Sequence, residues 1–366
     1  MKRILQIAAS LSIGGAEKVC RDIGMSLDPA EYEVHYIVFG DAVGDYEPEL
    51  MEHGCRIFHW PSPSGSYPAY LRALRDLMRE NRYHAVHAHT MFNIGWAMLA
   101  AKQCGVPVRV AHAHSALDNG GGMKKRAYEE AMRGLILQNA TDLVACGEAA
   151  GIRLFGEKAY RKSGKLILNG VDTRRFAFDP AVRDKMRAEL RLDDAFVVGH
   201  VGHLMEVKNQ SFLIRLMPEI LKRKPNARLL LLGEGEDRPM LERLIRNQDL
   251  TDRVIMTGNV RNVPDYLSAM DVFAFPSLFE GMPLSIIEVQ SNGLPCVLST
   301  GVPKDVHLTD LVQPLPLEQP DRWAHAICSA ERRDSERYSD RMKRAGFDAA
   351  EVMEKFQAIY ERAERN

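Results

Sequence analysis

Several features that mark particular protein classes are missing from this 366-residue sequence. Lys and Arg number 48 and Asp and Glu 49, so no net charge favours nucleic acid as a partner. The six cysteines lie far apart and form no CxxC pair, which argues against a disulfide framework or a zinc site. No apolar run approaches the length of a membrane-spanning helix, and the first residues lack the apolar core of a signal peptide. These absences predict a cytoplasmic protein with reduced thiols.

The composition and the length predict a soluble protein of two domains. Hydrophobic residues make up 46% of the chain and charged residues 27%, which is ordinary for a globular protein. Short apolar runs alternate with helical patterns, and this alternation restarts after the polar, turn-rich segment 168–180. Repeated strand–helix alternation is typical of an α/β parallel sheet covered by helices on both faces. We therefore expect two Rossmann-like domains facing a central cleft, over 1–174 and 175–346, with ligands at the carboxyl ends of the strands.

Two amphipathic segments need a docking surface. In the last helix, Asp348 and Glu351 form a capping box before an apolar stripe that includes Phe356 and Tyr360. In residues 70–82, four arginines share one helical face beside a stripe of leucine and methionine. Together with the basic cluster at 124–126, this pattern suits an anionic membrane surface. The alternative is a helix that faces the core and has a solvated back.

The strongest chemical signal is a pair of glutamates with the spacing E-x7-E, Glu280 and Glu288. The first lies in a loop after a predicted strand, and the second lies about one turn into a predicted helix. Carboxylates accept hydrogen bonds, so the pair suits two hydroxyls, one on a sugar and one on a ribose. The simpler alternative is a loop charge and a solvated helix charge.

The helix that carries the second glutamate is predicted to begin near Pro283 or Leu284, where a proline suits the first turn. Gly281 allows a ligand to approach the backbone closely. The free N–H groups of the first turn and the helix dipole favour an anion at this point. The residues expected to hold a diphosphate here are Gly281, Met282, Pro283 and Leu284.

A family resemblance begins with residues 279–300, which read FEGMPLSIIEVQSNGLPCVLST. They resemble the nucleotide-sugar motif of retaining GT-B glycosyltransferases of family four, the glycosyl transferases group 1. Other segments resemble that family in the expected order, and they are GGAEKV (14–19), HAHS (112–115), NGVD (169–172), VGHLMEVKN (201–209), LLLLGEGEDRPMLE (229–242), VIMTGNVRNVPDYL (254–267) and GVPKDV (301–306). Single motifs are weak signals, but the ordered set is strong and spans nearly the whole chain. Within the family, the sequence resembles enzymes of capsular or exopolysaccharide assembly.

The resemblance assigns roles to several of these residues. Lys208 is implied to bind the donor diphosphate and to act in catalysis, and Glu280 to orient the sugar. Glu288 is implied to bind the ribose. The family usually pairs the lysine with an arginine where this sequence has His203. A neutral imidazole donates one hydrogen bond and only an imidazolium adds charge, so diphosphate affinity or its pH dependence is expected to differ.

Residues near three other predicted strand ends are implied to approach the nucleotide. Gly14 and Gly15 let a loop pass close to the donor phosphates, although they are not part of a GxGxxG fingerprint. Gly233, in LLLLGEGED, is implied to lie beside the nucleotide. Asn259 and Val260, in TGNV, are implied to hold the base through backbone groups.

Two HxH pairs end predicted strands, His87 with His89 and His112 with His114. The resemblance places His114 at the acceptor side, close to the transferred sugar, and gives it a catalytic role. A metal site normally adds a third histidine or a carboxylate at matching depth, and the sequence identifies none. The sequence also has no DxD triplet. We therefore expect no metal and no other cofactor.

The sequence thus predicts a retaining, metal-independent glycosyltransferase. The donor is expected to be a nucleotide-diphosphate sugar, by analogy a UDP-sugar, and the acceptor a glycan or lipid-linked glycan. By the resemblance, the N-terminal domain binds the acceptor, the C-terminal domain binds the donor, and the helix in 347–366 packs back on the first domain. Two alternatives stay open, an epimerase of the same fold and a non-catalytic nucleotide- or glycan-binding protein. Peripheral contact with the inner face of the membrane also stays open, and we expect no nucleic acid as a partner.

Overall fold

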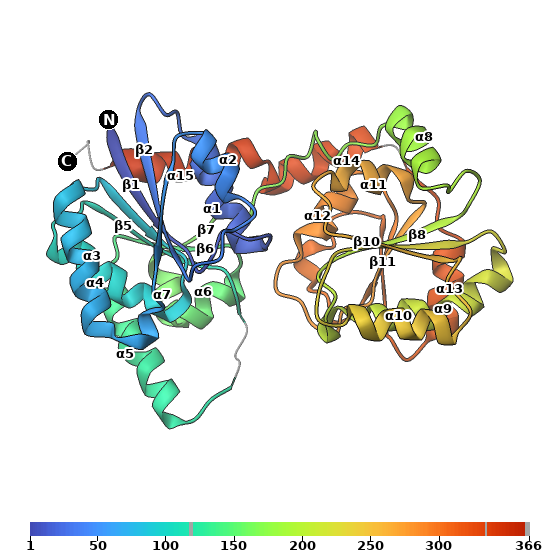
Figure 1. The fold of residues 1–366 in the computed structure, drawn as a ribbon, viewed down its shortest axis with the longest axis horizontal. Helices are drawn as coiled ribbons and strands as arrows, with labels where there is room; N and C mark the ends of the chain where they lie inside the picture. Colours follow the sequence, from blue (N-terminus) through green and yellow to red (C-terminus); the bar gives the residue numbers. More distant parts are fainter. Residues whose placement is uncertain (117–119, 334, 363–366) are drawn as a thin grey trace. The chain divides into compact units, whose positions relative to one another are not determined.

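A computed structural model describes residues 1–116, 120–333 and 335–362 as two compact units (Figure 1). Unit 1 contains Met1–Gly170 together with Ala349–Asn366, and unit 2 contains Val171–Asp348. Each unit has a parallel sheet of its own, so the α/β class with two parallel-sheet domains is confirmed. None of the helices in the described part of the chain is both long and apolar enough to cross a membrane.

Unit 1 contains a seven-stranded parallel sheet with the strand order β3-β2-β1-β4-β5-β6-β7. Its strands are β1 (Lys2–Ile7), β2 (Tyr32–Phe39), β3 (Arg56–Trp60), β4 (Ala85–Ala88), β5 (Val108–Ala113), β6 (Asp142–Ala145) and β7 (Gly164–Leu166). Its helices are α1 (Gly15–Ser26), α2 (Glu47–Glu52), α3 (Tyr67–Asn81), α4 (Ile94–Gln103), α5 (Met123–Asn139), α6 (Glu148–Phe155), α7 (Glu157–Ser163) and α15 (Ala349–Glu361). One face of the sheet packs against α3 to α6, and the other packs against α1, α2 and α15.

Unit 2 contains a six-stranded parallel sheet with the strand order β10-β9-β8-β11-β12-β13. Its strands are β8 (Val197–Val201), β9 (Arg228–Leu232), β10 (Val254–Gly258), β11 (Val272–Phe275), β12 (Cys296–Ser299) and β13 (Val312–Leu315). Its helices are α8 (Pro180–Glu189), α9 (Gln210–Arg223), α10 (Arg238–Asn247), α11 (Val263–Ala269), α12 (Leu284–Ser291), α13 (Pro320–Cys328) and α14 (Ser335–Met342). Helical cover on both faces explains the almost continuous apolar runs of the strands, such as the four leucines of β9.

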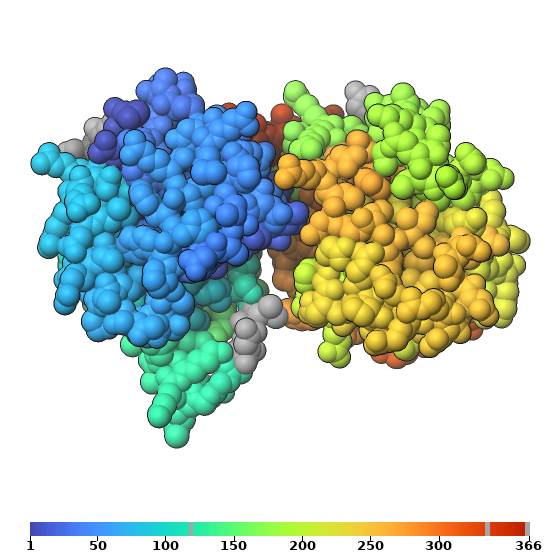
Figure 2. Space-filling view, viewed as in Figure 1, coloured from blue at the N-terminus to red at the C-terminus, as the bar shows by residue number. Residues whose placement is uncertain are grey.

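The apolar stripe of α3 faces the core of unit 1. Leu74 and Met78 are buried there, whereas Arg72 and Arg79 are exposed on the opposite side of the helix. The core-facing interpretation of residues 70–82 is therefore confirmed, and this stripe cannot also enter a membrane. The first turn of α5 projects from unit 1, with Met123 88% exposed (Figures 1 and 2).

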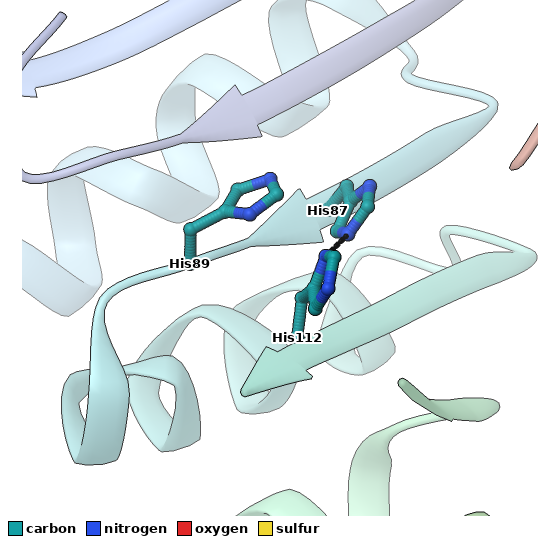
Figure 3. A group of neighbouring side chains, drawn as sticks. All are labelled: His87, His89 and His112. Atoms are coloured by element: carbon teal, nitrogen blue, oxygen red, sulfur yellow. Dashed lines mark hydrogen bonds between the residues drawn. The ribbon is translucent and has the colours of Figure 1, made fainter. Parts of the chain in front are cut away.

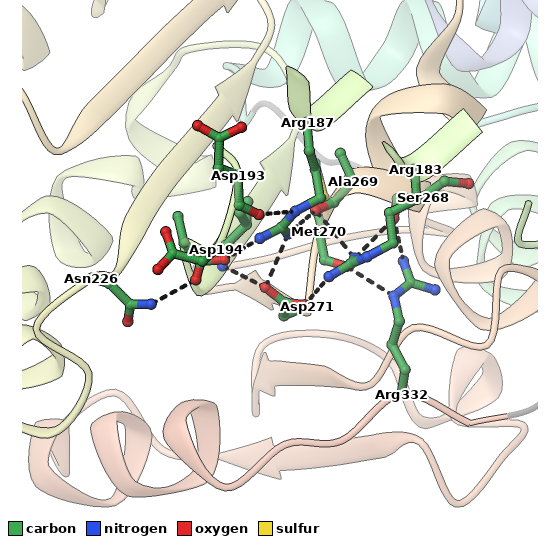
Figure 4. Close-up of polar contacts among 12 residues, drawn as sticks. Arg183, Arg187, Asp193, Asp194, Asn226, Ser268, Ala269, Met270, Asp271 and Arg332 are labelled. Atoms are coloured by element: carbon green, nitrogen blue, oxygen red, sulfur yellow. Dashed lines mark hydrogen bonds and ion pairs between the residues drawn. The ribbon is translucent and has the colours of Figure 1, made fainter. Parts of the chain in front are cut away.

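Three arginines tie the C-terminal end of α11 to the rest of unit 2 (Figure 4). Arg183 and Arg187 both pair with Asp271, which comes directly before β11. Arg332 donates to the Met270 carbonyl at 2.8 Å, and burial lowers its pKa to about 9. These bonds satisfy carbonyls that the end of a helix leaves without an intrahelical partner. The cluster therefore has a structural explanation, at the edge of the sheet opposite to the carboxyl ends of the strands.

Candidate functional site

The carboxyl ends of β8 and β11 mark the point where the strand order of unit 2 reverses. β8 pairs with β9 on one side and with β11 on the other. Ligands of open parallel sheets bind at such a point. The loops that leave the two strands are fastened to each other, because the Leu278 N–H donates to the Val207 carbonyl at 2.7 Å and Asn209 Nδ2 donates to the Pro276 carbonyl at 3.2 Å.

The two loops bring together the predicted lysine and the first predicted glutamate. Lys208 Nζ donates to Glu280 Oε1 at 2.7 Å, and their side chains are 20% and 10% exposed. The ammonium also lies 5.2 Å from the centre of the Phe275 ring. The pair therefore sits in a partly desolvated place, where charge acts more strongly than it does in water. An anion that binds here meets a cation whose position is already fixed by a carboxylate and an aromatic ring.

His203 lies on the same loop but faces solvent. Its Nε2 lies 3.1 Å from Glu236 Oε2, and the two side chains are 57% and 65% exposed. An exposed pair of this kind contributes little to stability, so both side chains can turn toward a ligand. His203 and Lys208 therefore pair with different carboxylates, Glu236 and Glu280.

A second histidine, His200, supports the loop that carries His203, although the sequence did not single it out. His200 is fully buried in β8, and its Nδ1 lies 3.0 Å from the Ala274 carbonyl. Gln210 Nε2 lies 3.3 Å from His200 Nε2 and donates to the His203 carbonyl at 2.8 Å. Burial lowers the pKa of His200 to about 4, so the ring is neutral at pH 7. The sequence signal was a histidine two residues before Gly202, in the segment HVGHL.

Two glycines of the loop after β9 allow close packing of backbone against backbone. Gly233 has φ +137°, and a Cβ built on it would lie 2.1 Å from the Gly202 carbonyl oxygen. Gly235 has φ +159°, and its Cβ would lie 2.2 Å from the Leu204 carbonyl oxygen. Both positions therefore require glycine. These glycines shape the loop that carries His203, which is a structural reason for the GEG sequence.

The helix α12 begins at Leu284, within the predicted start, with Pro283 at its N-cap position. No side chain caps this end of the helix. Nothing lies within 4 Å of a Cβ built on Gly281, so the backbone there is open to a ligand. Met282 is partly buried, and Glu288 lies one turn into the helix, also partly buried. The start of α12 thus offers the free N–H groups expected of an anion site.

The residues predicted to hold the base lie after β10. Asn259 is exposed and Val260 is partly buried. The Gly233 N–H donates to the Gly258 carbonyl at 2.9 Å, which joins this loop to the loop after β9. The predicted base-binding residues therefore lie next to the predicted glycine Gly233.

In unit 1, the loop after β1 differs from a simple phosphate loop. Gly14 is the N-cap residue of α1, and a Cβ there would lie 2.3 Å from Glu17 Oε2. Gly15 is exposed, with nothing within 4 Å of its Cβ position. The chain's own Glu17 carboxylate therefore lies beside the start of α1, where an anionic ligand would have to displace it.

Histidines from β4 and β5 gather on one face of the unit 1 sheet (Figure 3). His87 Nε2 lies 3.1 Å from His112 Nδ1, and His89 Nδ1 lies 2.8 Å from His114 Nε2. Side chains two residues apart share a face of a strand, and β4 and β5 are neighbours in the sheet. Gln6 on β1 and Tyr360 on α15 complete the group, and we call these six residues the histidine network. His114 is partly buried at its edge, and the others are buried.

Burial keeps the imidazoles of the histidine network neutral. It lowers the pKa of His87 to about 3 and that of His114 to about 4. The pKa values of His89 and His112 are also lowered well below the usual range, first by burial and then by neighbouring histidines. No carboxylate of the described residues bonds to these rings, and only the more distant charge of Asp142 works against the lowered pKa of His87, as a smaller effect than burial.

The arrangement corrects one argument from the sequence. A third histidine at matching depth was not expected, yet His87, His89 and His112 each place one ring nitrogen within 4.8 Å of the others. The two HxH pairs meet because their strands are adjacent, which the sequence does not reveal. In the structure these nitrogens bond to one another or to Gln6 and Tyr360. The expectation that no metal takes part stays a prediction.

The structure therefore places the predicted residues in two groups. In unit 2 the loops at the switch point carry Lys208, Glu280 and His203, with Gly233, the start of α12, Asn259 and Val260 on the same edge of the sheet. In unit 1 the carboxyl ends of the strands carry His114 and the Gly14–Gly15 turn. Sequence reasoning missed the supporting residues Gln6, His200 and Tyr360.

Comparisons with known proteins match both units. Residues 195–331 match the family described as Glycosyl transferases group 1, and residues 14–161 match the Glycosyl transferase 4-like domain. The EpsF protein of Bacillus subtilis, which is named as a glycosyltransferase, is 34% identical over 358 residues, or 95% of this chain and 93% of its own. The capsular polysaccharide biosynthesis glycosyltransferase CapH of Staphylococcus aureus is 24% identical over 336 residues, or 89% of this chain and 90% of its own.

Solved structures with the same fold include HepE of Anabaena in complex with UDP-glucose. That structure covers 100% of both chains with a TM-score of 0.76 and 21% sequence identity. At this identity the likeness establishes the GT-B fold, in agreement with the two parallel sheets.

Proposed function

This chain belongs to the glycosyl transferases group 1 and is a glycosyltransferase of polysaccharide biosynthesis, for which we propose a donor, an acceptor and a stereochemistry. The enzyme moves a hexose or hexosamine from a UDP-sugar to a hydroxyl of a glycan or lipid-linked glycan, with retention at the anomeric carbon. The UDP complexes of HepE, a protein of the same fold, support the choice of donor. The reaction needs no metal in this proposal.

The observation that carries the proposal is the pair of Lys208 and Glu280 at the switch point of unit 2. When the bond between the sugar and the diphosphate breaks, negative charge develops on the leaving phosphate. A cation already held in a partly desolvated place stabilises that charge without first having to reorganise. Lys208, 2.7 Å from Glu280, is such a cation. Glu280 in turn accepts hydrogen bonds from the sugar hydroxyls and orients the ring.

Each of the other predicted residues of unit 2 binds a different part of the donor. The N–H groups of Gly281, Met282 and Leu284, around the N-cap residue Pro283 of α12, bind the diphosphate, and His203 adds a hydrogen bond in place of the usual arginine. Glu288 accepts hydrogen bonds from the ribose. The backbone of Asn259 and Val260 holds the base.

Two parts of unit 1 complete the proposal. The Gly14–Gly15 turn contacts the donor phosphates, once Glu17 has moved aside. His114 contacts the transferred sugar or positions the acceptor hydroxyl. The departing phosphate accepts the proton of that hydroxyl, so the chemistry needs no separate base. Exclusion of water during transfer limits hydrolysis of the donor.

A panel of nucleotides tests the donor class. UDP, GDP, ADP and NAD, with UDP-glucose and GDP-mannose, are added to the full chain and unfolding is followed by thermal shift. A ligand at one hundred times its dissociation constant adds about 2.7 kcal/mol of stability, which is readily detected. UDP and its sugars should raise the unfolding temperature and NAD should not. A shift with GDP compounds alone would refute the choice of UDP, and a shift with NAD alone would refute the transferase.

Peripheral membrane contact is a separate part of the proposal. The exposed first turn of α5 carries Met123 and the basic residues 124–126, and the outer face of α3 carries Arg72 and Arg75. These cations suit an anionic lipid surface. Flotation with anionic liposomes should recover the protein, and Arg72→Glu plus Arg75→Glu should weaken the recovery. A charge-matched control, Arg243→Glu plus Arg246→Glu on α10, should leave it unchanged. Equal recovery of all three proteins would contradict the contact.

A further inference from the structure

The hydrogen bonds of the histidine network form one chain with two unpaired ends. The ends are His114 Nδ1 and His112 Nε2, two buried ring nitrogens that have no hydrogen-bond partner among residues 1–116, 120–333 and 335–362. Between them, every polar side-chain atom of the network bonds to another member. A neutral imidazole has one N–H donor and one acceptor nitrogen, so the sense of one bond fixes the sense of the next.

The amide of Gln6 joins the two branches of this chain. One end of the amide lies 3.1 Å from the Tyr360 hydroxyl oxygen, and the other lies 2.8 Å from His89 Nε2. A half-turn of the amide exchanges its oxygen and its nitrogen and leaves its shape almost unchanged. A tyrosine hydroxyl both donates and accepts, so it can pair with either end of the amide. The chain can therefore run in either of two senses with all of its bonds kept.

In the first sense, the amide nitrogen donates to the Tyr360 hydroxyl and the amide oxygen accepts from His89 Nε2. His89 Nδ1 then accepts from His114 Nε2, which leaves His114 Nδ1 as a bare acceptor. On the other branch, the Tyr360 hydroxyl donates to His87 Nδ1, and His87 Nε2 donates to His112 Nδ1. This leaves His112 Nε2 as an unpaired N–H donor.

In the second sense, every one of these bonds is reversed. His114 Nδ1 becomes an N–H donor and His112 Nε2 becomes a bare acceptor. The two senses contain the same number of protons and no charge, which agrees with rings that burial keeps neutral. Each sense thus leaves one donor and one acceptor unpaired, always at opposite ends of the chain.

We propose that the histidine network is a two-state hydrogen-bond chain, which lets His114 offer either an acceptor or a donor at Nδ1 while it stays uncharged. The two ends are coupled, because His114 and His112 carry their protons both on Nε2 or both on Nδ1. Gln6 and Tyr360 are the positioning residues that transmit the sense from one branch to the other. A ligand that pairs with His114 Nδ1 favours one sense and shifts the whole chain toward it.

This arrangement suits a ligand that offers donors and acceptors at the same point, as a sugar does. A hydroxyl can donate to His114 or accept from it, whereas the carbonyl of an N-acetyl group only accepts. The chain serves both groups without placing a charge in the buried part of unit 1, where a charge is costly. The ligand is therefore a hydroxyl or an N-acetyl group of the transferred sugar. Its identity rests on the proposed glycosyl transfer, whereas the coupling of the two ends does not.

The coupling can be measured on the full chain without any substrate. Long-range ¹H–¹⁵N spectra at pH 8 of protein labelled in its histidines distinguish a protonated from a bare ring nitrogen, and His112→Gln and His114→Gln assign the signals. The share of His114 protonated on Nε2 should equal the share of His112 protonated on Nε2. Unequal shares, which place two donors or two bare nitrogens at the ends of one chain, would overturn the proposal.

A variant at one end should set the tautomer at the other end. The carboxylate of His114→Glu only accepts, so His89 must donate to it and the chain must run in the second sense. His112 should then be protonated on Nδ1 alone. His114→Gln is the matched control, since its amide either donates or accepts and leaves both senses open. Protonation of His112 on Nε2 in the His114→Glu variant would refute the coupling.

A cut in the middle of the chain separates this coupling from direct contact, since the His112 and His114 rings lie 4.0 Å apart. Tyr360→Phe removes the hydroxyl between the branches, so adding His114→Glu to it should no longer change the tautomer of His112. Gln6→Met cuts the chain at the amide and should have the same effect. Persistence of the His114→Glu effect in both cut chains would refute the positioning roles.

A second tyrosine variant controls for loss of a buried hydroxyl as such. The Tyr36 hydroxyl is also buried in unit 1, but it donates to the Cys20 carbonyl at 2.8 Å, outside the network. In the Tyr36→Phe background, His114→Glu should still bring His112 to the Nδ1–H form. Loss of the effect in Tyr36→Phe as well as in Tyr360→Phe would show that any such variant abolishes it, and would refute transmission through Tyr360.

UDP-glucose then connects the chain to its ligand. At saturation it should change the ratio of the two senses about fivefold, the value of one net hydrogen bond, with equal changes at His114 and His112. In Tyr360→Phe the change should stay at His114. UDP-glucose that binds in the thermal-shift assay and changes neither ring would refute the contact with the sugar. Absence of binding by every nucleotide sugar would refute the proposed function instead, since the substrate-free spectra report the coupling independently.

Discussion

Lowering the pH from 8 to 5 is expected to destabilise unit 1 more than unit 2. Unit 1 buries the four histidines of the network with their pKa values held down by desolvation. The folded state therefore binds fewer protons than the unfolded chain below the ordinary histidine pKa of about 6.5. Such a group contributes full stability above that pKa, and the contribution is lost as the pH falls toward the folded-state value.

The size of the loss follows from the pKa values. At pH 5, a histidine that stays neutral in the fold costs about 1.5 pH units times 1.4 kcal/mol, or about 2 kcal/mol. His87 and His114, with pKa values of about 3 and about 4, therefore remove about 4 kcal/mol from unit 1. His89 and His112 act in the same direction. Unit 2 has His200, with a pKa of about 4, which removes about 2 kcal/mol, and His307, whose pKa is also lowered by burial, acts in the same direction.

Hydrogen exchange followed by mass spectrometry measures the two units separately. Opening free energies of peptides from β4 and β5 should fall by at least about 4 kcal/mol between pH 8 and pH 5, after correction for the intrinsic exchange rate, and those from β11 and β12 by about half as much. His87→Gln should lower the number of protons that unit 1 takes up on unfolding near pH 5 by about one, which reduces the slope of its stability against pH. Equal losses in both units, or a slope that His87→Gln does not change, would refute the reasoning.

Other predictions concern unit 2. Lys208→Ala should lower kcat about a hundredfold, because the leaving diphosphate loses its cation. The control Lys222→Ala, on the exposed face of α9, should leave kcat unchanged. Similar kinetics in both variants would show that Lys208 does not act in the site. Glu288→Ala should weaken UDP binding about tenfold or more in calorimetry without unfolding the protein, with the exposed Glu318→Ala as control, and unchanged affinity would end its ribose role. Gly233→Ala should cost about 2 kcal/mol or more in denaturant unfolding, because its Cβ would meet the Gly202 carbonyl at 2.1 Å, and Gly65→Ala, which meets nothing, should be nearly neutral.

Much of the fold could be predicted because most strands are short apolar runs. The apolar run of residues 296–299 forms β12, and α12 begins at Leu284, within the predicted start. The strand β13 was missed, since it has Pro314 and two exposed residues and forms the edge of its sheet. For α5 the sequence indicated only an amphipathic segment after the basic cluster 124–126, without bounds, because the 17 residues of this helix bury only Met132, Ile136 and Asn139.

The candidate site shows where sequence reasoning ends. The motifs pointed to Lys208 and Glu280 separately, but their ion pair joins residues 72 positions apart. It depends on β11 lying next to β8, and strand order is not visible in the sequence. The histidine network depends likewise on the adjacency of β1, β4 and β5, and on the docking of a helix that comes some 250 residues later. Residue types and loops could therefore be predicted, whereas partners across the sheet could not.

The position of α15 also has a consequence during synthesis on the ribosome. Unit 1 is discontinuous in the chain, because all of Val171–Asp348 is made before its last helix. Until then, one face of the unit 1 sheet lacks Val352, Phe356, Ile359 and Tyr360, and the Gln6 amide lacks the tyrosine hydroxyl to which it donates. Domains generally fold in the order in which they emerge, but here the first unit is completed last. A nascent chain stalled before residue 349 should therefore carry a folded unit 2 and an unfinished unit 1, with its sheet open to chaperones.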